Sequence, residues 1–323
     1  VDVLEEPMAS QICVGYLLCR VADTVEDAGH IPPEAQSDVL RTYRRAIDPD
    51  EDADIVEFRA AVDEWLPAER DDDWTVVAEA PTIAATFEEL DPEAQAAIVP
   101  PVLEMVDGMA MFVDRHATEG GLRIGDRDEL EQYCYYAAGT VGNLITNLLT
   151  RGDLDEERAT RLRETAEEFG LLLQLVNVSK DVYDDYTEEN NVYLPAEWLA
   201  AEGVDQESVV DPAHRDSAAR VVGRTAEYAR SFLDDAQTYL ESMPLTHGNT
   251  MEAWTVPYLL AVGTLRELRS RPEDALTEAG VKVSRQEVFA VMAVASDVSR
   301  ESLAELRETI ARTPYHRAAE PAN

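Results

Sequence analysis

Apolar residues recur at intervals of three and four along almost the whole chain, which is the spacing of one face of an α-helix. In one stretch, for example, Leu162, Ala166, Phe169, Leu173 and Val176 follow one another at spacings of four, three, four and three. Alternating runs of β-branched residues between turn signals, which would predict strands, are scarce. The sequence therefore predicts an all-α fold. The expected helices cover residues 8–29, 33–46, 52–66, 73–90, 92–118, 127–150, 154–187, 213–242, 248–271 and 284–311.

The segments between these helices are too short to act as linkers between domains. A chain of 323 residues can bury a sizeable core as one unit, so we expect a single domain over residues 1–323. The sequence begins with Val1 instead of a methionine, from which we expect an incomplete N-terminus. The tail at residues 313–323, "TPYHRAAEPAN", is expected to be frayed.

The charge balance excludes several classes of partner. The chain has 27 basic and 66 acidic residues and a net charge of -39, which would repel nucleic acids and disfavour anionic membrane surfaces. A hydrophobic content of 45% indicates a globular protein with an acidic surface and not a disordered chain. The basic residues are 25 arginines and 2 lysines. This composition predicts a salt-adapted cytoplasm, as in a halophilic archaeon, where high ionic strength screens the repulsion.

Cysteine usage and hydropathy agree with a cytoplasmic location. Cys13, Cys19 and Cys134 are widely spaced within apolar helical patterns, so we expect free buried thiols in a reducing interior. The most apolar stretch, "AAIVPPVLEMVDGMAMFV", contains Glu104 and Asp107. We therefore expect no transmembrane segment.

Polar residues follow one face of the most apolar of the expected helices. Gln174, Asn177, Asp181 and either Asp184 or Asp185 fall at positions i, i+3, i+7 and i+10 or i+11. Burying such groups is costly unless partners or metal ions compensate. The pattern predicts an internal cavity that holds cations. The alternative is that this end of the helix is simply solvated.

A similar polar face occurs in the first expected helix. Tyr16, Arg20, Asp23 and Asp27 fall at i, i+4, i+7 and i+11, opposite an apolar face. Asp23 and Asp27 are therefore neighbours one turn apart and are able to share a cation.

A third polar face is expected in the helix at 127–150. Gly139 and Gly142 in this helix would permit close approach of another helix, because they carry no Cβ atom. The polar positions are Tyr133, Tyr136, Thr140, Asn143 and Asn147.

The two D-x-x-x-D pairs indicate a divalent metal. Asp23 with Asp27 and Asp181 with Asp185 supply hard oxygen ligands. Mg²⁺ takes one or two carboxylates and fills its other positions with water and phosphate oxygens, and Mn²⁺ is an alternative. Two such pairs that face each other would hold a diphosphate between them.

The only lysines of the chain are Lys180, directly before Asp181, and Lys282, three residues before Arg285. Their survival in a chain that otherwise uses arginine favours roles that need a compact cation in contact with phosphate. The alternative is chance retention of two neutral positions.

These motifs resemble those of the squalene/phytoene synthases, a family of head-to-head prenyl transferases. "YLLCRVADTVED" is similar to its first aspartate-rich motif, "YCYYAAGTVG" to its tyrosine and glycine signature, and "LLLQLVNVSKDVYDD" followed by "YLP" to its second aspartate-rich motif. Their order and spacing match over about residues 10–310. The resemblance implies a class I isoprenoid synthase-like helical bundle around a central cavity.

Three other segments, "PTIAATFEEL", "MVDGMAMFVDRHA" and "GVKVSR", resemble the squalene branch more than the phytoene branch. This implies condensation of two farnesyl diphosphates to presqualene diphosphate and reduction by NADPH to squalene, with peripheral membrane contact for product release. One alternative is a phytoene synthase that condenses two geranylgeranyl diphosphates without a reductant. A second alternative is a non-catalytic member that serves as a binding or assembly module.

The resemblance also implies roles for individual residues. Asp23, Asp27, Asp181 and Asp185 would be catalytic Mg²⁺-diphosphate ligands, and Tyr133 would be a general base or cation stabiliser. The implied substrate-binding residues are Arg20, Tyr16, Lys180, Tyr136 and Gln174, and the implied NADPH-binding residues are Lys282, Arg285 and Asn177. No G-x-G-x-x-G element is present, so a nicotinamide site of Rossmann type is not expected.

The sequence departs from the family pattern at two places. Lys180 stands where the family usually has arginine, which replaces a bidentate fork with a point charge. Asn190 and Asn191 stand in a loop one residue longer than usual, where a Gly-Arg pair is usual. These asparagines put the corresponding diphosphate contact in doubt.

Overall fold

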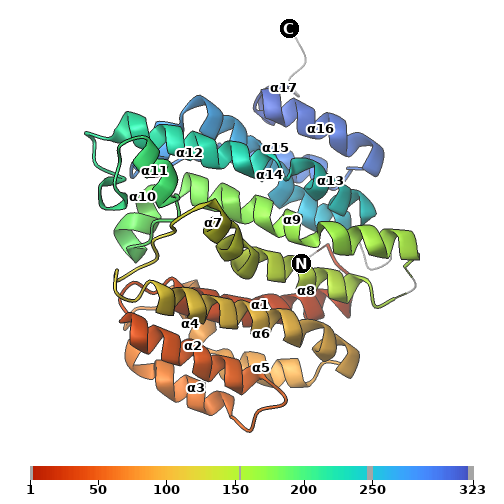
Figure 1. Cartoon of the computed structure of the whole chain (residues 1–323). Helices are drawn as coiled ribbons and strands as arrows, with labels where there is room; N and C mark the ends of the chain where they lie inside the picture. The colour runs from red at the N-terminus through yellow and green to blue at the C-terminus, as the bar shows by residue number, and fades with distance from the viewer. Residues whose placement is uncertain (1–2, 153, 246–249, 319–323) are drawn as a thin grey trace.

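The computed structural model describes residues 3–152, 154–245 and 250–318, which form a bundle of helices (Figure 1). The only β-type pairing within these residues is an isolated bridge between Arg123 and Val192. The predicted all-α fold is confirmed. In chain order the elements are α1 (Met8–Glu26), α2 (Pro33–Ile47), α3 (Ile55–Val62), η1 (Asp63–Trp65), α4 (Asp72–Ala78), α5 (Ala80–Glu88), α6 (Pro92–Arg115), α7 (Arg127–Cys134), η2 (Tyr135–Gly139), α8 (Thr140–Leu149), α9 (Glu156–Lys180), α10 (Val182–Asp184), η3 (Asp185–Glu189), α11 (Ala196–Ala201), η4 (Gln206–Ser208), α12 (Arg215–Arg230), α13 (Leu233–Ser242), α14 (Thr250–Ser270), η5 (Pro272–Leu276), α15 (Arg285–Ala295), α16 (Arg300–Arg312) and α17 (Tyr315–Ala318).

Aspartate side chains start several of these helices. Asp54, Asp71, Asp91, Asp126 and Asp155 are N-cap residues, and each accepts a hydrogen bond from a backbone N–H of the first turn. Such a cap contributes about 1 kcal/mol, because it satisfies a donor that has no partner within the helix. Part of the acidic composition is therefore used for local structure.

The helices form two groups with α7, α8 and α9 between them (Figure 1). In the N-terminal group, α1 packs against α2, α4, α5 and α6, and α2 packs against α6. In the C-terminal group, α14 packs against α12, α13, α15 and α16. The central pair α8 and α9 contacts both groups, since α8 packs against α1 and α6 while α9 packs against α12, α13 and α14. One continuous hydrophobic core extends from Leu4 to Ile310.

Several predicted helices are interrupted. The one expected at 73–90 divides at Glu79, where Pro81 sits in the first turn of α5. The one expected at 284–311 divides at the capping box of Ser299, which begins α16. The prediction of one continuous helix at 213–242 is also wrong, because a turn at Ser231 and Phe232 separates α12 from α13.

The two expected helices that carry site residues contain π-helical turns. The helix expected at 127–150 consists of α7, the π-helical η2 and α8. The helix expected at 154–187 ends at Lys180 and is followed by α10 and the π-helical η3. Each π turn adds one residue, which rotates the side chains that follow it, and such turns occur frequently at functional sites.

Helix α6 lies where the sequence predicts no transmembrane segment, yet by length and composition its 24 residues are a candidate to cross a membrane. However, 61% of its apolar window is buried inside the protein. The helix packs against α1, α2 and α8, as a core helix does.

The expectation of a frayed tail at 313–323 is wrong for Tyr315–Ala318, which form α17. The backbone N–H of Tyr315 donates a hydrogen bond to Glu287 Oε1 at 3.0 Å. Residues 319–323 lie outside the described part of the chain.

The cysteines are free, as predicted. Cys19 and Cys134 are buried and Cys13 is half-buried. Burial raises the pKa of the Cys19 thiol to about 12, so this thiol is unreactive at neutral pH.

Candidate active site

The two acidic segments meet at one end of the bundle. A Cβ atom on Gly29, just after α1, would lie 3.0 Å from the carbonyl oxygens of Glu188 and Glu189, so the backbones are in close contact there. Glu26 of α1 and Glu189 of η3 line the same cavity, which has a volume of about 20 Å³. Residues more than 150 positions apart in the sequence are thereby brought together.

The carboxylates of the two segments influence one another. Burial raises the pKa of Asp27 well above its usual range, and the charges of Asp23, Glu26 and Glu189 raise it further. Burial also raises the pKa of Glu189 to about 7, and the charges of Asp23 and Asp181 add to this increase. Asp23 itself has a raised pKa because of burial, although Arg20 opposes the shift. A cation at this end would relieve the repulsion.

In the second segment, Asp181 and Asp185 are linked through the backbone. Asp181 caps the end of α9, and its carbonyl accepts a hydrogen bond from the N–H of Asp185 at 2.9 Å. Asp185 is half-buried, and burial together with the charges of Glu189 and Asp181 raises its pKa well above the usual range. Asp184 is exposed. Of the two alternatives left by the sequence, Asp185 is therefore the residue in the acidic cluster.

Tyr133 is buried behind the acidic residues of α1. Its side chain is 3% exposed, and its hydroxyl donates toward Glu26 Oε2 at 3.4 Å and toward the Tyr193 hydroxyl at 3.1 Å. The rings of Tyr133 and Tyr193 stack with centroids 4.7 Å apart, and Phe112 packs edge-on against Tyr133 at 5.4 Å. Burial raises the pKa of Tyr133 well above its usual range, so the phenol is protonated at neutral pH.

Glu26 is the buried acid at the base of this cluster. Burial raises its pKa to about 8, with a further increase from Asp23. Its Oε2 atom faces Tyr133, whereas Oε1 is buried without a hydrogen-bond partner. A buried carboxyl oxygen without a partner is uncommon in proteins and is a candidate ligand atom.

The two cations predicted to bind substrate are held by carboxylates. Arg20 donates to Asp73 Oδ1 at 2.9 Å and to Oδ2 at 2.6 Å, and it also pairs with Asp23. These hydrogen bonds lower the pKa of Asp73. Lys180 pairs with Asp181.

An apolar cavity lies farther along α1. Its volume is about 270 Å³, and it is bounded by α1, α8 and α14. Tyr16, 54% exposed, faces this cavity and lies seven residues before Asp23, a rise of about 10 Å along the helix. The residues that line the cavity are Leu4, Ile12, Cys13, Tyr16, Val141, Leu144, Ile145, Ala253 and Trp254.

Other predicted residues lie elsewhere. Gln174 is half-buried and Asn177 is exposed, both on the last turns of α9 before Asp181. Tyr136 belongs to the π turn that begins at Tyr135 and lines a different cavity, of about 410 Å³. The structure therefore does not bring Tyr136 into the apolar cavity.

Lys282 precedes α15 and Arg285 is its first residue, and both are exposed. No polar contact joins either side chain to the acidic cluster in the described part of the chain.

Asn190 and Asn191 have structural roles. Asn190 has φ of 60°, a left-handed conformation that asparagine tolerates better than most residues, and its side chain donates to the Gly120 carbonyl at 3.0 Å. It also accepts a hydrogen bond from the buried Arg123 at 2.9 Å. Asn191 is buried and accepts from the Leu122 N–H at 2.8 Å. Asn191 is buried and Asn190 is exposed, but both side chains are engaged in hydrogen bonds within the protein, which agrees with the doubt about a diphosphate contact at this position.

The donor set fits Mg²⁺. Carboxylate oxygens are the ligands that this ion prefers, and it commonly takes one or two of them together with water and phosphate. Among the described residues no group of three His, Cys, Asp or Glu side chains is close enough to hold a metal by itself. The mutual pKa increases and the orphaned Glu26 Oε1 show a site that is short of positive charge. The carboxylates as they stand leave coordination positions for ligands that the protein does not supply.

Sequence reasoning missed four residues of this site. Glu26 stands within "DTVED", three residues after Asp23, so helical spacing already placed it beside the predicted ligands. Tyr193 begins the quoted "YLP" and Glu189 lies between the two quoted parts of the second motif, but nothing in their spacing indicated contact with α1. Asp73 is 53 residues from Arg20 and carried no local signal.

Comparisons with known proteins show the family of the chain. A family model described as "Squalene/phytoene synthase" matches residues 1–287. The squalene synthase of Rattus norvegicus is 26% identical over 267 residues, which cover 82% of this chain and 58% of that protein. The squalene synthase of Homo sapiens is 23% identical over 298 residues, covering 92% of this chain and 66% of that protein. The 15-cis-phytoene synthase of Enterobacter agglomerans is 34% identical over 152 residues, 46% of each chain.

Solved structures share the fold. A complex of TcSQS with the ligand BPH1237 superposes with a TM-score of 0.79 at 21% identity, covering 100% of this chain and 87% of that chain. A dehydrosqualene synthase in complex with a ligand gives a TM-score of 0.62 at 21% identity, covering 92% and 88%. With a family model matched over residues 1–287 and the same helical fold, the chain belongs to the squalene/phytoene synthase family of prenyltransferases.

Proposed function

We propose that the protein condenses two molecules of farnesyl diphosphate head to head to presqualene diphosphate and then reduces this to squalene with NADPH. The observation that carries the proposal is the meeting of the acidic residues of α1 and η3 at one end of α1, with an apolar cavity farther along the same helix. A diphosphate and a long hydrocarbon chain need such an arrangement. Similarity to squalene synthases over 82% and 92% of the chain supports this branch of the family.

Asp23, Asp27, Asp181 and Asp185 are the proposed ligands of Mg²⁺, with Mn²⁺ as a substitute. When bound, the ion supplies a Lewis acid that stabilises the departing diphosphate. Arg20 and Lys180 stand beside these carboxylates and are placed to transfer their contacts to diphosphate oxygens. Because Lys180 offers a point charge, it would orient the diphosphate less strictly than an arginine.

Tyr133 is the residue proposed to transfer the proton of the reacting chain and to stabilise its positive charge. Its ring can stabilise a nearby carbocation by roughly 0.5–2 kcal/mol. Its hydroxyl lies 3.4 Å from Glu26 Oε2, and it can pass a proton to this oxygen when Glu26 is ionised. The pKa of Glu26 is raised to about 8, which lies close to neutral pH. The ionised carboxylate is therefore a strong enough base to accept that proton.

The apolar cavity has the role of excluding water. A carbocation must meet the alkene of the second substrate before it meets water, which requires a dry surface. Tyr16, Val141 and Ile145 line this cavity and would contact the prenyl chains. The length of chain that fits is the property that separates a C15 from a C20 substrate.

Lys282 and Arg285 are the proposed contacts for the phosphates of NADPH, with Asn177 near the reacting end. Both cations are exposed, and among the described residues neither side chain forms a hydrogen bond or an ion pair. Unpaired cations suit a polyanionic cofactor. We place the protein in the cytoplasm, with peripheral membrane contact when the hydrocarbon product leaves.

Product analysis tests the proposal. Purified protein is incubated with farnesyl or geranylgeranyl diphosphate, with Mg²⁺ or EDTA, and with or without NADPH. We expect presqualene diphosphate from farnesyl diphosphate in the absence of NADPH, squalene in its presence, and no product in EDTA.

A second candidate is favoured by one observation, the 34% identity to a phytoene synthase over 46% of the chain. A C40 product that forms independently of NADPH would establish that candidate and overturn the proposal. Absence of any product from a folded protein that still binds prenyl diphosphates would instead support a binding or assembly role.

A further inference from the structure

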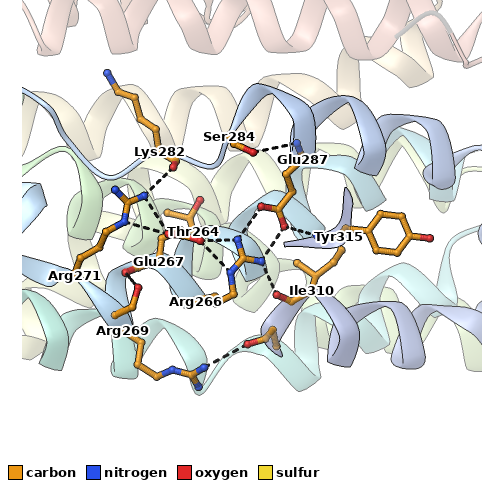
Figure 2. A network of polar contacts seen from close by, with 12 residues as sticks. Thr264, Arg266, Glu267, Arg269, Arg271, Lys282, Ser284, Glu287, Ile310 and Tyr315 are labelled. Atoms are coloured by element: carbon orange, nitrogen blue, oxygen red, sulfur yellow. Dashed lines mark hydrogen bonds and ion pairs between the residues drawn. The ribbon is translucent and has the colours of Figure 1, made fainter. Parts of the chain in front are cut away.

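A buried ion pair joins α14 to α15. Arg266 of α14 is 7% exposed and Glu287 of α15 is 1% exposed. The guanidinium donates two parallel hydrogen bonds, from Nη1 to Oε1 and from Nη2 to Oε2, both at 2.8 Å (Figure 2). This is the bidentate geometry in which arginine binds a carboxylate most strongly.

The pair also holds the C-terminal helices. Arg266 Nη1 donates to the carbonyl of Ile310 in α16 at 2.7 Å. The N–H of Tyr315, at the start of α17, donates to Glu287 Oε1 at 3.0 Å (Figure 2). Four helices therefore converge on one ion pair.

The same network fixes the chain segment before α15, which we call the cationic segment (residues 282–285). Glu267 accepts from Arg266 at 2.7 Å and from Arg271 at 3.1 Å. Arg271 in turn donates to the carbonyl of Lys282 at 3.2 Å. The beginning of the cationic segment is thus connected to Arg266 through two side chains (Figure 2).

The other end of the cationic segment is connected to Glu287. The N–H of Glu287 donates to Ser284 Oγ at 3.2 Å, which caps α15. Between the two ends, Val283 packs against Gly263 of α14, where an added Cβ atom would lie 3.3 Å from Val283 Cγ2. The backbone of the segment is therefore held at both ends and in the middle.

The side chains that the segment presents are turned away from this network. Figure 2 shows the Lys282 ammonium group directed away from the ion pair. Lys282 and Arg285 are exposed, and within the described residues their charged groups have no polar partner. Earlier in the chain, η5 (Pro272–Leu276) ends five residues before Val281, after which Lys282 begins the segment, and η5 packs against α10, which precedes Asp185. The element η5, from which the chain leads to the cationic segment, therefore contacts the second acidic segment.

A buried ion pair is not the arrangement that stability alone would favour. Desolvation of two charges offsets much of their attraction, and well-packed apolar residues in their place often give equal or greater stability. What the pair does provide is a fixed geometry, since its hydrogen bonds are satisfied in only one register of α15 against α14.

We propose that Arg266 and Glu287 are positioning residues that hold the cationic segment in place, so that Lys282 and Arg285 form a preordered site for the phosphates of a nicotinamide dinucleotide phosphate. The inference rests on the proposed NADPH-dependent reduction. It adds to that proposal Arg266 of α14 and Glu287 of α15, neither of which touches the cofactor.

The test replaces the pair by apolar residues of similar size, Arg266→Met with Glu287→Leu, which leaves no unpaired buried charge. The control is Arg269→Met, on the same helix, where the lost contact is to the Ala311 carbonyl at 3.4 Å and not to the cationic segment. Three quantities are measured for each protein: the Kd of NADPH by fluorescence titration, hydrogen exchange of the amides at 281–288, and the rate of presqualene diphosphate formation without NADPH.

We expect the double variant to bind NADPH about tenfold to a hundredfold more weakly, as loss of positioning typically causes. Its amides at 281–288 should exchange faster, while its rate of presqualene diphosphate formation should equal that of the unmodified protein. The control should match the unmodified protein in all three. Unchanged exchange and unchanged NADPH affinity in the folded double variant would overturn the inference, and so would an equal fall in both half-reactions.

The experiments distinguish a failure of the proposed function from a failure of the positioning role. If the unmodified protein binds no NADPH and forms no squalene, the reductive step and the cofactor part of the inference are both wrong. If it binds NADPH with the expected affinity and the double variant does so equally well, only the positioning role is wrong.

Discussion

Among single residues, Tyr133 and Glu26 form the contact on which the proposed chemistry depends most. Tyr133 was expected at the site from its motif, but its partner was not. The hydroxyl of Tyr133 reaches Glu26 and Tyr193, both of which lie on other elements. The environment of the tyrosine is therefore a product of packing, whereas its presence is a property of the motif.

Replacing Tyr133 with phenylalanine tests the role of the hydroxyl. The stacking with Tyr193 is retained while the hydrogen bonds are lost. We expect the rate of condensation to fall by about a hundredfold or more, the usual effect of losing a proton-transfer group, with little change in the melting temperature. Tyr135→Phe is the control, because it removes a hydroxyl that contacts Glu104 at 2.8 Å and not the acidic cluster. Similar rates for the two variants would contradict the proposed role.

The raised pKa of Glu26 predicts how stability depends on pH in the absence of divalent metal. Its pKa is about 8 in the folded protein against an ordinary value of 4.5, so the folded state retains a proton that the unfolded chain releases. This contribution to stability is fully present below about pH 4.5 and is lost as the pH rises to about 8. The full effect is on the order of a few kcal/mol.

Calorimetry in EDTA between pH 5 and pH 8 measures this effect. We expect the melting temperature to fall with rising pH, and to fall less steeply in Glu26→Gln. Glu188→Gln, which changes an exposed acid of the same cluster, should keep the original slope. An identical slope for all three proteins would show that Glu26 does not carry the shift.

At the scale of secondary-structure elements, periodicity predicted the positions of most helices but not their interruptions. α1, α2 and α6 begin where expected, since each begins at a proline or after a turn signal and continues with one apolar face. The π turns η2 and η3 have no such signal. Each adds one residue to a turn, which shifts the side chains that follow it in a way that a regular helical spacing does not predict.

Close helix approach at Gly142 was predicted and is confirmed. A Cβ atom there would lie 2.2 Å from the carbonyl oxygen of Ala166 in α9. We expect Gly142→Ala to lower the free energy of unfolding by about 1–3 kcal/mol, because α8 and α9 would have to move apart. Urea denaturation measures the change.

The control for this prediction is Gly223→Ala in α12, where no atom lies within 4 Å of the added Cβ. Alanine favours helix over glycine by roughly 0.5–1 kcal/mol, so this variant should be neutral or more stable. Destabilisation of both variants by the same amount would indicate a general effect of the substitution and not a close contact of α8 with α9.

For the whole molecule, the net charge of -39 is the dominant property. Many of its ion pairs are exposed, for example Arg127 with Asp128 and Arg161 with Glu157, and pairs of this kind contribute little at moderate salt. The acidic groups in excess repel one another, and added salt shortens the distance over which this repulsion acts. The Debye length falls from about 10 Å at 0.1 M to about 3 Å at 1 M.

We therefore expect the protein to be more stable in concentrated salt. The melting temperature should rise by about 5 °C or more between 0.1 M and 2 M KCl, which for a chain of this size corresponds to roughly 2 kcal/mol. NaCl at the same ionic strength should give a similar increase if screening is the cause. A melting temperature that is constant or falls with salt would contradict the salt-adapted interpretation.

The sequence by itself determined the helical class, the polar faces of individual helices and the residue types of the candidate site. These depend on spacing within one helix, which is set by the backbone geometry of a few neighbouring residues. Tertiary structure alone decided that Asp27 and Glu189 act on each other, that Arg20 is held by Asp73, and that Arg266 reaches Glu287. Such contacts join residues far apart in the chain. They form because the apolar faces of the helices can be buried together in only a few arrangements. This constraint acts on the whole bundle, so no local sequence pattern contains it.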